Sequence, residues 1–233
     1  MNSLPQNIFE YINIFATNKY INKKFFSIRK LRINQNKYMT NEILLNLNVD
    51  RIISLDLYNN YNITDVSIKH LSNLKELNLY QNNNITNEGI KYLVNLEKIN
   101  LKCNKKITYE GIKNLSKLVH LDISYNINIS DVHIKQFSNL QELSINFESN
   151  ISDGGIKHLT NLKILILFGN DNISDEGIKY LINLEKIILF NTKITDHGIK
   201  YLIKLKNINS ICNKNITIEG LRALPKLEEY SYI

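Results

Sequence analysis

Histidine and cysteine are the side chains of this sequence that could ligate a metal or act as a base or nucleophile, provided that several of them come together. The histidines lie far apart along the chain, at His70, His120, His133, His158 and His197. The two cysteines, Cys103 and Cys212, are too few for a metal site or a disulfide framework. We therefore expect no catalytic constellation, no metal and no cofactor, and the sequence does not indicate an enzyme.

Basic residues recur at nearly even spacing and could follow a polyanion along the molecule. They are Lys69, Lys91, Lys113, Lys135, Lys157, Lys179, Lys200 and Arg222. Acidic residues such as Asp175, Glu176 and Asp196 share the same segments, and we expect no aromatic stacking platform between the lysines. The pattern favours a solvated outer face and disfavours nucleic acid as a partner, although the chain carries a formal charge of +7.

Glycine also recurs, once per segment, whereas a phosphate-binding loop would need several glycines clustered after one strand. The positions are Gly89, Gly111, Gly155, Gly177, Gly198 and Gly220. This spacing predicts a structural role, in which glycine permits neighbouring helices to pack closely.

All of these positions follow one repeat that runs through most of the chain. The first apolar strand residue of each unit falls at steps of 22 residues, with one step of 21, at Leu55, Leu77, Ile99, Leu121, Leu143, Leu165, Ile187, Ile208 and Tyr230. Within residues 74–92, apolar side chains alternate at Leu77 and Leu79, which predicts a strand with one buried face. An isoleucine, a Thr or Ser suited to cap a helix, and apolar residues at helical spacing then predict a short helix.

A single unit of strand, turn and helix cannot bury its apolar face, so the units must stack. Stacked strands lie about 4.8 Å apart, whereas packed helices lie about 8 to 10 Å apart. The sequence therefore predicts an α/β solenoid that curves into an arc, with parallel strands on the concave face and short helices on the convex face.

The strand segments carry a family signature. LKELNLYQN (74–82), LEKINLKCN (96–104), LVHLDISYN (118–126) and LKILILFGN (162–170) resemble the LxxLxLxxN pattern of leucine-rich repeats. The resemblance implies that the signature asparagines bond the turn backbone, copy on copy, at Asn60, Asn82, Asn104, Asn126, Asn170 and Asn213. Glu148 and Thr192 occupy this position in two units, and Ser210 replaces a strand leucine, so we expect local irregularity there.

A helical segment, residues 1–29, is expected before a leucine-rich-repeat domain of about nine units with a 22-residue period over residues 30–233. Within LPQNIFEYINIF, five residues resemble the start of an F-box, the helical module that docks on the Skp1 adaptor of cullin ubiquitin ligases: Leu4, Pro5, Ile8, Phe9 and Ile12. The resemblance implies that these residues bind a Skp1-like adaptor. The alternative is a helical cap that shields the core of the first unit.

Strand residues that point away from the core change character along the array. Early units place polar side chains there, such as Asp56, Glu76 and Lys98, whereas the later segments KILILF and KIILF are apolar on both faces. The exposed members predict a protein-binding patch on the concave face, made of Ile164, Ile166, Phe168, Ile188, Phe190 and Ile211. The alternatives are that the C-terminal tail or another subunit covers this patch, or that Ile211 turns inward in place of Ser210.

The hydropathy of the chain and its N-terminal residues indicate in which compartment we expect the protein. No run of about 18 apolar residues is present, so we expect no membrane-spanning helix and no membrane partner. The N-terminus MNSLPQNIFEYIN lacks the basic start and unbroken apolar core of a secretory signal. We expect an intracellular protein, cytoplasmic or nuclear, that binds another protein, either as the substrate receptor of a Skp1-cullin-F-box ubiquitin ligase or as a free-standing scaffold.

Overall fold

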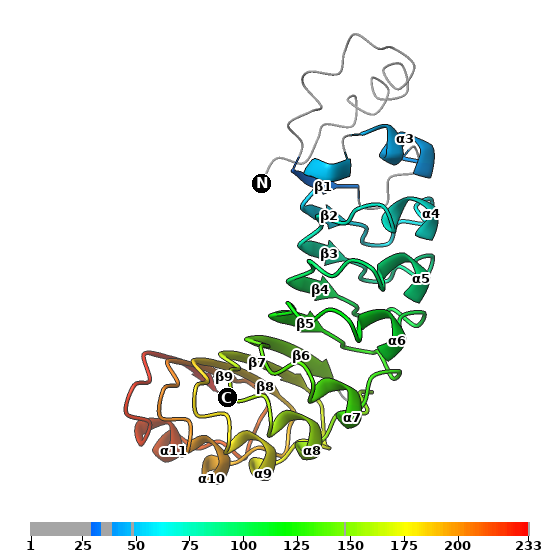
Figure 1. Ribbon diagram of the computed structural model, residues 1–233. Helices are drawn as coiled ribbons and strands as arrows, with labels where there is room; N and C mark the ends of the chain where they lie inside the picture. The colour runs from blue at the N-terminus through cyan, green and yellow to red at the C-terminus, as the bar shows by residue number, and fades with distance from the viewer. Residues whose placement is uncertain (1–28, 34–38, 48, 147, 233) are drawn as a thin grey trace. The chain divides into compact units, whose positions relative to one another are not determined.

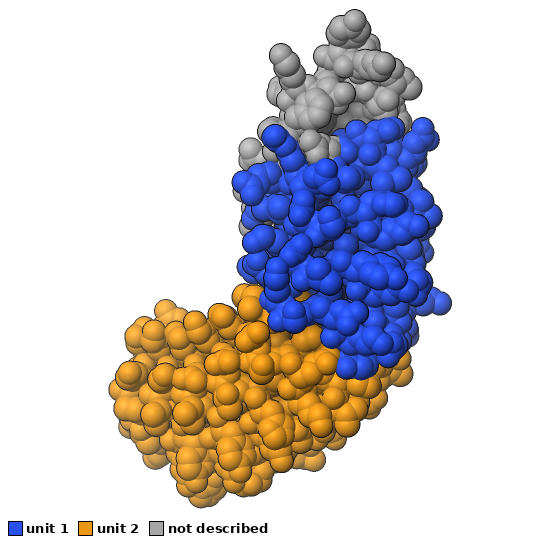
Figure 2. All heavy atoms as spheres, viewed as in Figure 1, with its two compact units in different colours: residues 1–117 blue, residues 118–233 orange. Residues whose placement is uncertain are grey.

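The computed structural model describes residues 29–33, 39–47, 49–146 and 148–232 (Figure 1). The chain divides into two compact units, residues 1–117 and 118–233 (Figure 2). Within each unit the strands line one side and the helices line the other (Figure 1). We call these sides the strand face and the helix face.

In the first unit, strands and short helices alternate along the chain as the repeat predicts. Its strands are parallel and pair in chain order, so that equivalent core residues such as Leu55 and Leu77 lie side by side. The elements are β1 (Lys30–Arg32), α3 (Asn41–Asn46), the 3₁₀ helix η1 (Val49–Arg51), β2 (Ser54–Asp56), α4 (Asp65–Ile68), β3 (Glu76–Asn78), α5 (Asn87–Ile90), β4 (Lys98–Asn100) and α6 (Tyr109–Ile112).

The second unit repeats this arrangement with longer strands at its centre. The elements are β5 (His120–Asp122), α7 (Asp131–Ile134), β6 (Glu142–Asn146), α8 (Asp153–Ile156), β7 (Ile164–Phe168), α9 (Asp175–Ile178), β8 (Lys186–Phe190), α10 (Asp196–Ile199), β9 (Asn207–Ser210), α11 (Ile218–Arg222) and β10 (Glu229–Tyr232). Strands β6, β7 and β8 have five residues each, against three in each strand of the first unit. The sheet therefore extends further in the repeats that carry the predicted apolar patch.

The predicted core positions are buried, because alternate strand residues point between the strand face and the helix face. Leu77 and Leu79 expose 2% and 0% of their surface, and Leu165 and Leu167 expose none. The prediction is wrong at Tyr230, which exposes 51%. Tyr230 pairs with the buried Ile208, but β10 is the last strand in the sheet order and packs on β9 from one side.

The signature asparagines form the predicted ladder inside the turns. Asn82, fully buried, donates from Nδ2 to the carbonyls of Leu57 (3.2 Å) and Asn60 (2.8 Å) in the preceding repeat. Its Oδ1 accepts from the backbone N–H groups of Asn84 (3.0 Å) and Ile85 (3.1 Å) in its own turn. One fully buried side chain thus bonds four backbone groups, and it joins two repeats.

The predicted Thr and Ser residues cap the helices, and many of these caps are tied to the preceding repeat. Thr86 begins α5 by accepting from the backbone N–H of Glu88 (3.2 Å). Asp65, at the start of α4, accepts from Thr86 N (2.9 Å) and Thr86 Oγ1 (2.6 Å). The carboxylate therefore binds the cap of the next helix, and similar bonds join Asp131 to Ser152, Asp153 to Ser174, Asp175 to Thr195 and Asp196 to Thr217.

This carboxylate also explains the recurring glycine. A Cβ atom added to Gly89 would lie 2.3 Å from Asp65 Oδ1, and one added to Gly177 would lie 2.3 Å from Asp153 Oδ1. Both distances are far below van der Waals contact, so only glycine lets the helix approach the preceding repeat this closely. The structural role predicted for these glycines is confirmed.

One residue per turn adopts the left-handed backbone conformation, directly before the signature position. These residues are Asn59, Gln81, Cys103, Tyr125, Gly169, Asn191 and Cys212, with φ from 50° to 63°. A side chain with a Cβ atom is strained there, and glycine is not.

Replacing Gln81 with glycine is expected to raise the free energy of unfolding by about 1 kcal/mol, because glycine removes the strain at φ 54°. Gln81→Ala is the matched control, since alanine keeps the Cβ atom and should give no gain. Urea unfolding followed by circular dichroism measures both variants. Equal stability of the two variants would contradict the strain argument.

Candidate functional site

The predicted apolar residues lie together on the strand face of the second unit. Ile164, Ile166, Ile188 and Ile211 are half-buried, and the two aromatic rings are more open, with Phe168 exposing 44% and Phe190 exposing 42% of their surface. We call these six residues the apolar strand patch. Their exposure agrees with the expectation that both sides of β7 and β8 are apolar and that only one side is covered by the core.

The sheet register brings the patch residues of β7 and β8 into two rows. Ile166 pairs with Ile188, and Phe168 pairs with Phe190. The centroids of the two phenyl rings are 5.9 Å apart and the rings are tilted by 40°. Such spacing is typical of aromatic pairs in contact, so the two rings present one continuous apolar surface.

The row of Ile166 and Ile188 ends in a polar residue on the β9 side. Asn209 pairs with Ile188 and continues its row, and Ser210 is buried, donating from Oγ to the carbonyl of Ser231 (3.3 Å). Ser210 therefore keeps the inward position, and Ile211 does not replace it. Strand β10 pairs with β9 and extends the sheet, so its described residues do not cover the patch.

On the β6 side, the repeat is irregular, as expected from Glu148. Glu148 is exposed, and Ser149 is buried in its place, accepting from Ile151 N (3.3 Å) through its hydroxyl. Asn146, which pairs with Phe168, is 1% exposed and accepts from Tyr125 N (2.8 Å). Among the described residues, Asn146 Nδ2 is the buried side-chain nitrogen without a hydrogen-bond partner. The apolar rows therefore begin at β7.

Comparisons with known proteins agree with this geometry. The family described as Leucine Rich repeat matches residues 70–94, 92–116 and 158–182. The structure is similar to an internalin (InlF) from Listeria monocytogenes, with a TM-score of 0.69 and 22% identity over 97% of this chain and 68% of that chain. The fold is a leucine-rich-repeat solenoid.

Two further solved structures share the solenoid. Internalin C2 from Listeria monocytogenes has a TM-score of 0.64 and 25% identity over 84% of each chain. A chain of the Rad7 and Elc1 complex in yeast has a TM-score of 0.57 and 18% identity over 96% of this chain and 75% of that chain. No curated protein sequence matches the chain.

The strand face of the first unit of the solenoid is polar and charged, in contrast to the apolar strand patch. Tyr58 and Tyr80 stack with ring centroids 4.8 Å apart, and Lys102 Nζ lies 5.4 Å from the Tyr80 centroid. Asp56 accepts from Asn78 Nδ2 (3.0 Å) and pairs with Arg32 (3.3 Å). These side chains bond or stack with one another. The strand face of the first unit therefore offers a partner fewer unpaired side-chain groups.

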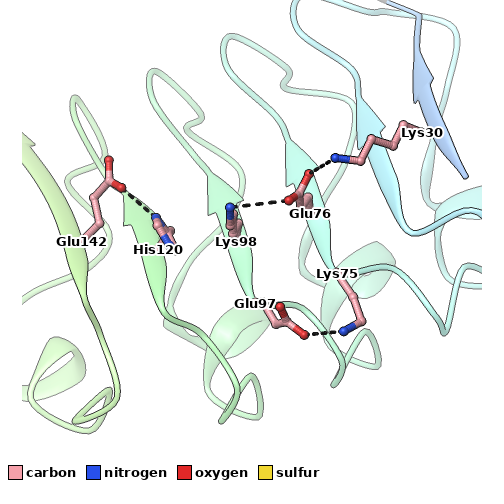
Figure 3. Close-up of polar contacts among 7 residues, drawn as sticks. All are labelled: Lys30, Lys75, Glu76, Glu97, Lys98, His120 and Glu142. Carbon is pink, nitrogen blue, oxygen red and sulfur yellow. Dashed lines mark hydrogen bonds and ion pairs between the residues drawn. The ribbon is translucent and has the colours of Figure 1, made fainter. Parts of the chain in front are cut away.

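Glu76 lies at the centre of the charged part of this face (Figure 3). Its carboxylate pairs with Lys98 (3.5 Å) and Lys30 (3.9 Å). Partial burial acts to raise the pKa of Glu76, but the Ser54 hydroxyl and the charges of Lys30 and Lys98 outweigh it, so this pKa lies below its ordinary value. In the second unit, His120 Nδ1 lies 2.7 Å from Glu142 Oε2 (Figure 3).

The recurring basic residues, from Lys69 to Arg222, lie at the C-terminal ends of helices α4 to α11, and we call them the lysine ladder. Acidic residues of the same helices neutralise part of it. Lys91 pairs with Glu88 (2.6 Å), and equivalent pairs join Lys113 to Glu110 (2.5 Å) and Lys179 to Glu176 (2.6 Å). The hydrogen bond that Lys91 donates to Glu88 raises the pKa of Lys91, and the one that Lys179 donates to Glu176 raises the pKa of Lys179. These pairs favour the predicted solvated face in those repeats.

The expectation that no aromatic residue interleaves with the ladder is wrong. The ammonium groups of Lys91, Lys179 and Lys200 lie 5.1 to 5.3 Å from the ring centroids of Tyr92, Tyr180 and Tyr201. These tyrosines expose 46% to 65% of their surface. Sequence reasoning missed them, although the recurring IKYL motif places a tyrosine directly after the lysine in each of these repeats.

Other candidates remain separate in the structure. Within the described residues, no three His, Cys, Asp or Glu side chains gather as a metal site. Cys103 is half-buried, and Cys212 is exposed. No helix in the described part of the chain is long and apolar enough to cross a membrane.

The F-box-like residues Leu4, Pro5, Ile8, Phe9 and Ile12 lie outside the described residues.

Proposed function

We propose that this solenoid is a protein-protein interaction module and that its apolar strand patch binds the partner. The observation that carries the proposal is the Phe168–Phe190 pair, two exposed aromatic rings in contact on a rigid sheet. Aromatic side chains supply much of the binding energy at interfaces because they bury a large apolar area with little loss of conformational freedom.

The surroundings of the ring pair support the same function. Ile166 and Ile188 lie directly beside the rings in the sheet register and enlarge the apolar surface. The buried residues Leu165, Leu167, Ile187 and Leu189 fix the strands from beneath. A partner would therefore meet a surface that is already formed, which lowers the entropic cost of binding.

The finer proposal is that the chain is the substrate receptor of a Skp1-cullin-F-box ubiquitin ligase. Its support is the resemblance of Leu4, Pro5, Ile8, Phe9 and Ile12 to the start of an F-box. A solved neighbour of similar fold, from the Rad7 and Elc1 complex, is itself part of a two-protein assembly. The alternative is a free-standing interaction scaffold, which shares the apolar strand patch but needs no adaptor.

The double variant Phe168→Asp with Phe190→Asp is expected to weaken partner binding at least about tenfold, because it places charge at the centre of the interface. Partners would be captured from a lysate with the intact chain, identified by mass spectrometry and purified. Isothermal titration calorimetry then compares their affinity for each variant.

The matched control is Tyr58→Asp with Tyr80→Asp, which changes an aromatic pair on the strand face of the first unit and should leave the affinity unchanged. Far-ultraviolet circular dichroism checks the fold of both variants. Equal affinity of the partner for the Phe168/Phe190 variant and for the intact chain would exclude the patch as the binding surface.

The adaptor proposal has a separate test. Skp1 should co-purify with the full chain and be lost when Pro5, Ile8 or Phe9 is replaced by aspartate. Retention of Skp1 by these variants would exclude the F-box-like residues as its binding site, and no retention by the intact chain would leave the free-standing scaffold as the function.

A further inference from the structure

A second surface of the second unit, distinct from the apolar strand patch, is formed by the segments that lead from each helix to the next strand. They are residues 157–163, 179–185 and 200–206, which follow α8 to α10, and residues 222–228, which begin with the last residue of α11 (Figure 1). Asn183 Nδ2 donates to the carbonyl of Thr160 (2.9 Å), and Lys204 Nζ donates to Asn183 Oδ1 (2.7 Å). Backbone bonds from Lys206 to Glu185 and from Glu228 to Lys206 continue the stack. We call this continuous surface the basic rim.

The basic rim carries a large excess of positive charge. Its four segments contain eight lysine or arginine residues and two acids, Glu185 and Glu228, which gives a formal charge of +6, close to the +7 of the whole chain. Lys179 pairs with Glu176, and Lys206 pairs with Glu185 (3.3 Å). Within the described part of the chain, the other six cations have no carboxylate at ion-pair distance: Lys157, Lys163, Lys200, Lys204, Arg222 and Lys226.

The two central segments of the rim expose apolar side chains between these cations. Tyr180 and Ile182 each expose 49% of their surface, and Tyr201 and Ile203 expose 46% and 53%. The pairs occupy equivalent positions in adjacent repeats, so tyrosine stands beside tyrosine and isoleucine beside isoleucine. An apolar centre is thus bordered by the basic segments 157–163 and 222–228.

We propose that the basic rim docks on an anionic lipid membrane surface. Lysine and arginine near such a surface each contribute about 1 kcal/mol of attraction. Tyrosine favours the headgroup region, and isoleucine gains by burial at the boundary with the acyl chains. The rim presents all three kinds of side chain together.

The apolar residues favour a membrane over a nucleic acid. Ile182 and Ile203 would gain nothing from phosphates and are not stacking platforms for bases. Lys179 and Lys200 already lie over the rings of Tyr180 and Tyr201, where a base would have to stack. The rim uses none of the six residues of the apolar strand patch, so a bound partner and a bound membrane are compatible at the level of individual side chains.

Flotation of the full chain with vesicles tests the proposal. The chain should bind vesicles of equal parts phosphatidylcholine and phosphatidylserine, and it should not bind phosphatidylcholine alone. Binding should weaken as salt is raised, because salt screens the surface charge. Lys157→Glu with Lys226→Glu should weaken binding about a hundredfold. Ile182→Ser with Ile203→Ser should weaken it about tenfold, through loss of apolar burial.

The matched control is Phe168→Ser with Phe190→Ser, which removes two exposed apolar side chains from the strand patch and should leave vesicle binding unchanged. All variants change exposed residues, and circular dichroism confirms their fold. Three results would each overturn the proposal: no binding to the anionic vesicles, equal loss in the Phe168/Phe190 control, or no effect of the isoleucine pair. The last result, accompanied by binding to polyuridylate, would assign the rim to nucleic acid.

Discussion

Replacing Asn82 with alanine is expected to lower the free energy of unfolding by about 4 kcal/mol. The substitution removes two hydrogen bonds donated by Nδ2 to Leu57 and Asn60 and two accepted by Oδ1 from Asn84 and Ile85. Because the Asn82 side chain and Ile85 are fully buried, the carbonyl of Asn60 and the N–H of Ile85 lose their partner away from water, whereas Leu57 O keeps its bond from Asn60 N (2.9 Å). An unpaired buried backbone group costs about 1 to 3 kcal/mol, so even partial relaxation leaves a large loss.

Asn83→Ala is the matched control for this prediction. Asn83 is the next residue, is exposed, and accepts one bond from Lys105 N (2.8 Å). Its loss should cost less than about 1 kcal/mol, because water can bind the freed N–H. Urea unfolding of the full chain, followed by circular dichroism, compares the two variants. If Asn82→Ala were no less stable than Asn83→Ala, the asparagine ladder would not be what holds the turns together.

Several features that were predicted correctly from the sequence depend on information inside one repeat. The alternation at Leu77 and Leu79 determines which strand residues are buried, and the hydroxyl of Thr86 caps a helix whose first residues follow it directly. These are local relations between neighbours in the chain. The apolar strand patch was predicted for the same reason, since two adjacent repeats lose the polar half of the alternation at Ile166 and Ile188.

The features that were not predicted from the sequence join different repeats, or they lie on surfaces whose residues are not part of the repeat signature. Asp65 binds the cap at Thr86 and crowds Gly89, but the sequence shows only that Asp and Gly both recur. The sequence contained one signal of this link between Asp and Gly. Tyr109 replaces the Asp or Asn in one repeat, and in the next repeat His133 replaces the glycine. The basic rim was missed because its tyrosines and isoleucines stand among lysines in segments interpreted only as helix ends.

The link between this carboxylate and the glycine leads to the second large effect. Gly177→Ala is expected to lower the free energy of unfolding by about 3 kcal/mol. The new Cβ atom would lie 2.3 Å from Asp153 Oδ1 and 3.0 Å from Ile156 Cδ1. To make room, Asp153 must give up its bonds to Ser174 N (2.7 Å) and Ser174 Oγ (2.6 Å). Gly154→Ala is the control, because the nearest atom to its Cβ atom would be the side-chain oxygen Asp131 Oδ2 at 3.0 Å, followed by Ser152 Oγ at 3.5 Å.

A double-mutant cycle identifies which contact produces the loss. Asp153→Ala alone removes the two bonds to Ser174 and should cost about 2 kcal/mol. Combined with Gly177→Ala, it also removes the oxygen that the new Cβ atom would strike, so the double variant should lose at least about 1 kcal/mol less than the sum of the single losses. Additive losses would instead assign the crowding to the backbone of Asp153 and to Ile156. Glycine would then be required by helix spacing alone, independently of the carboxylate that bridges the repeats.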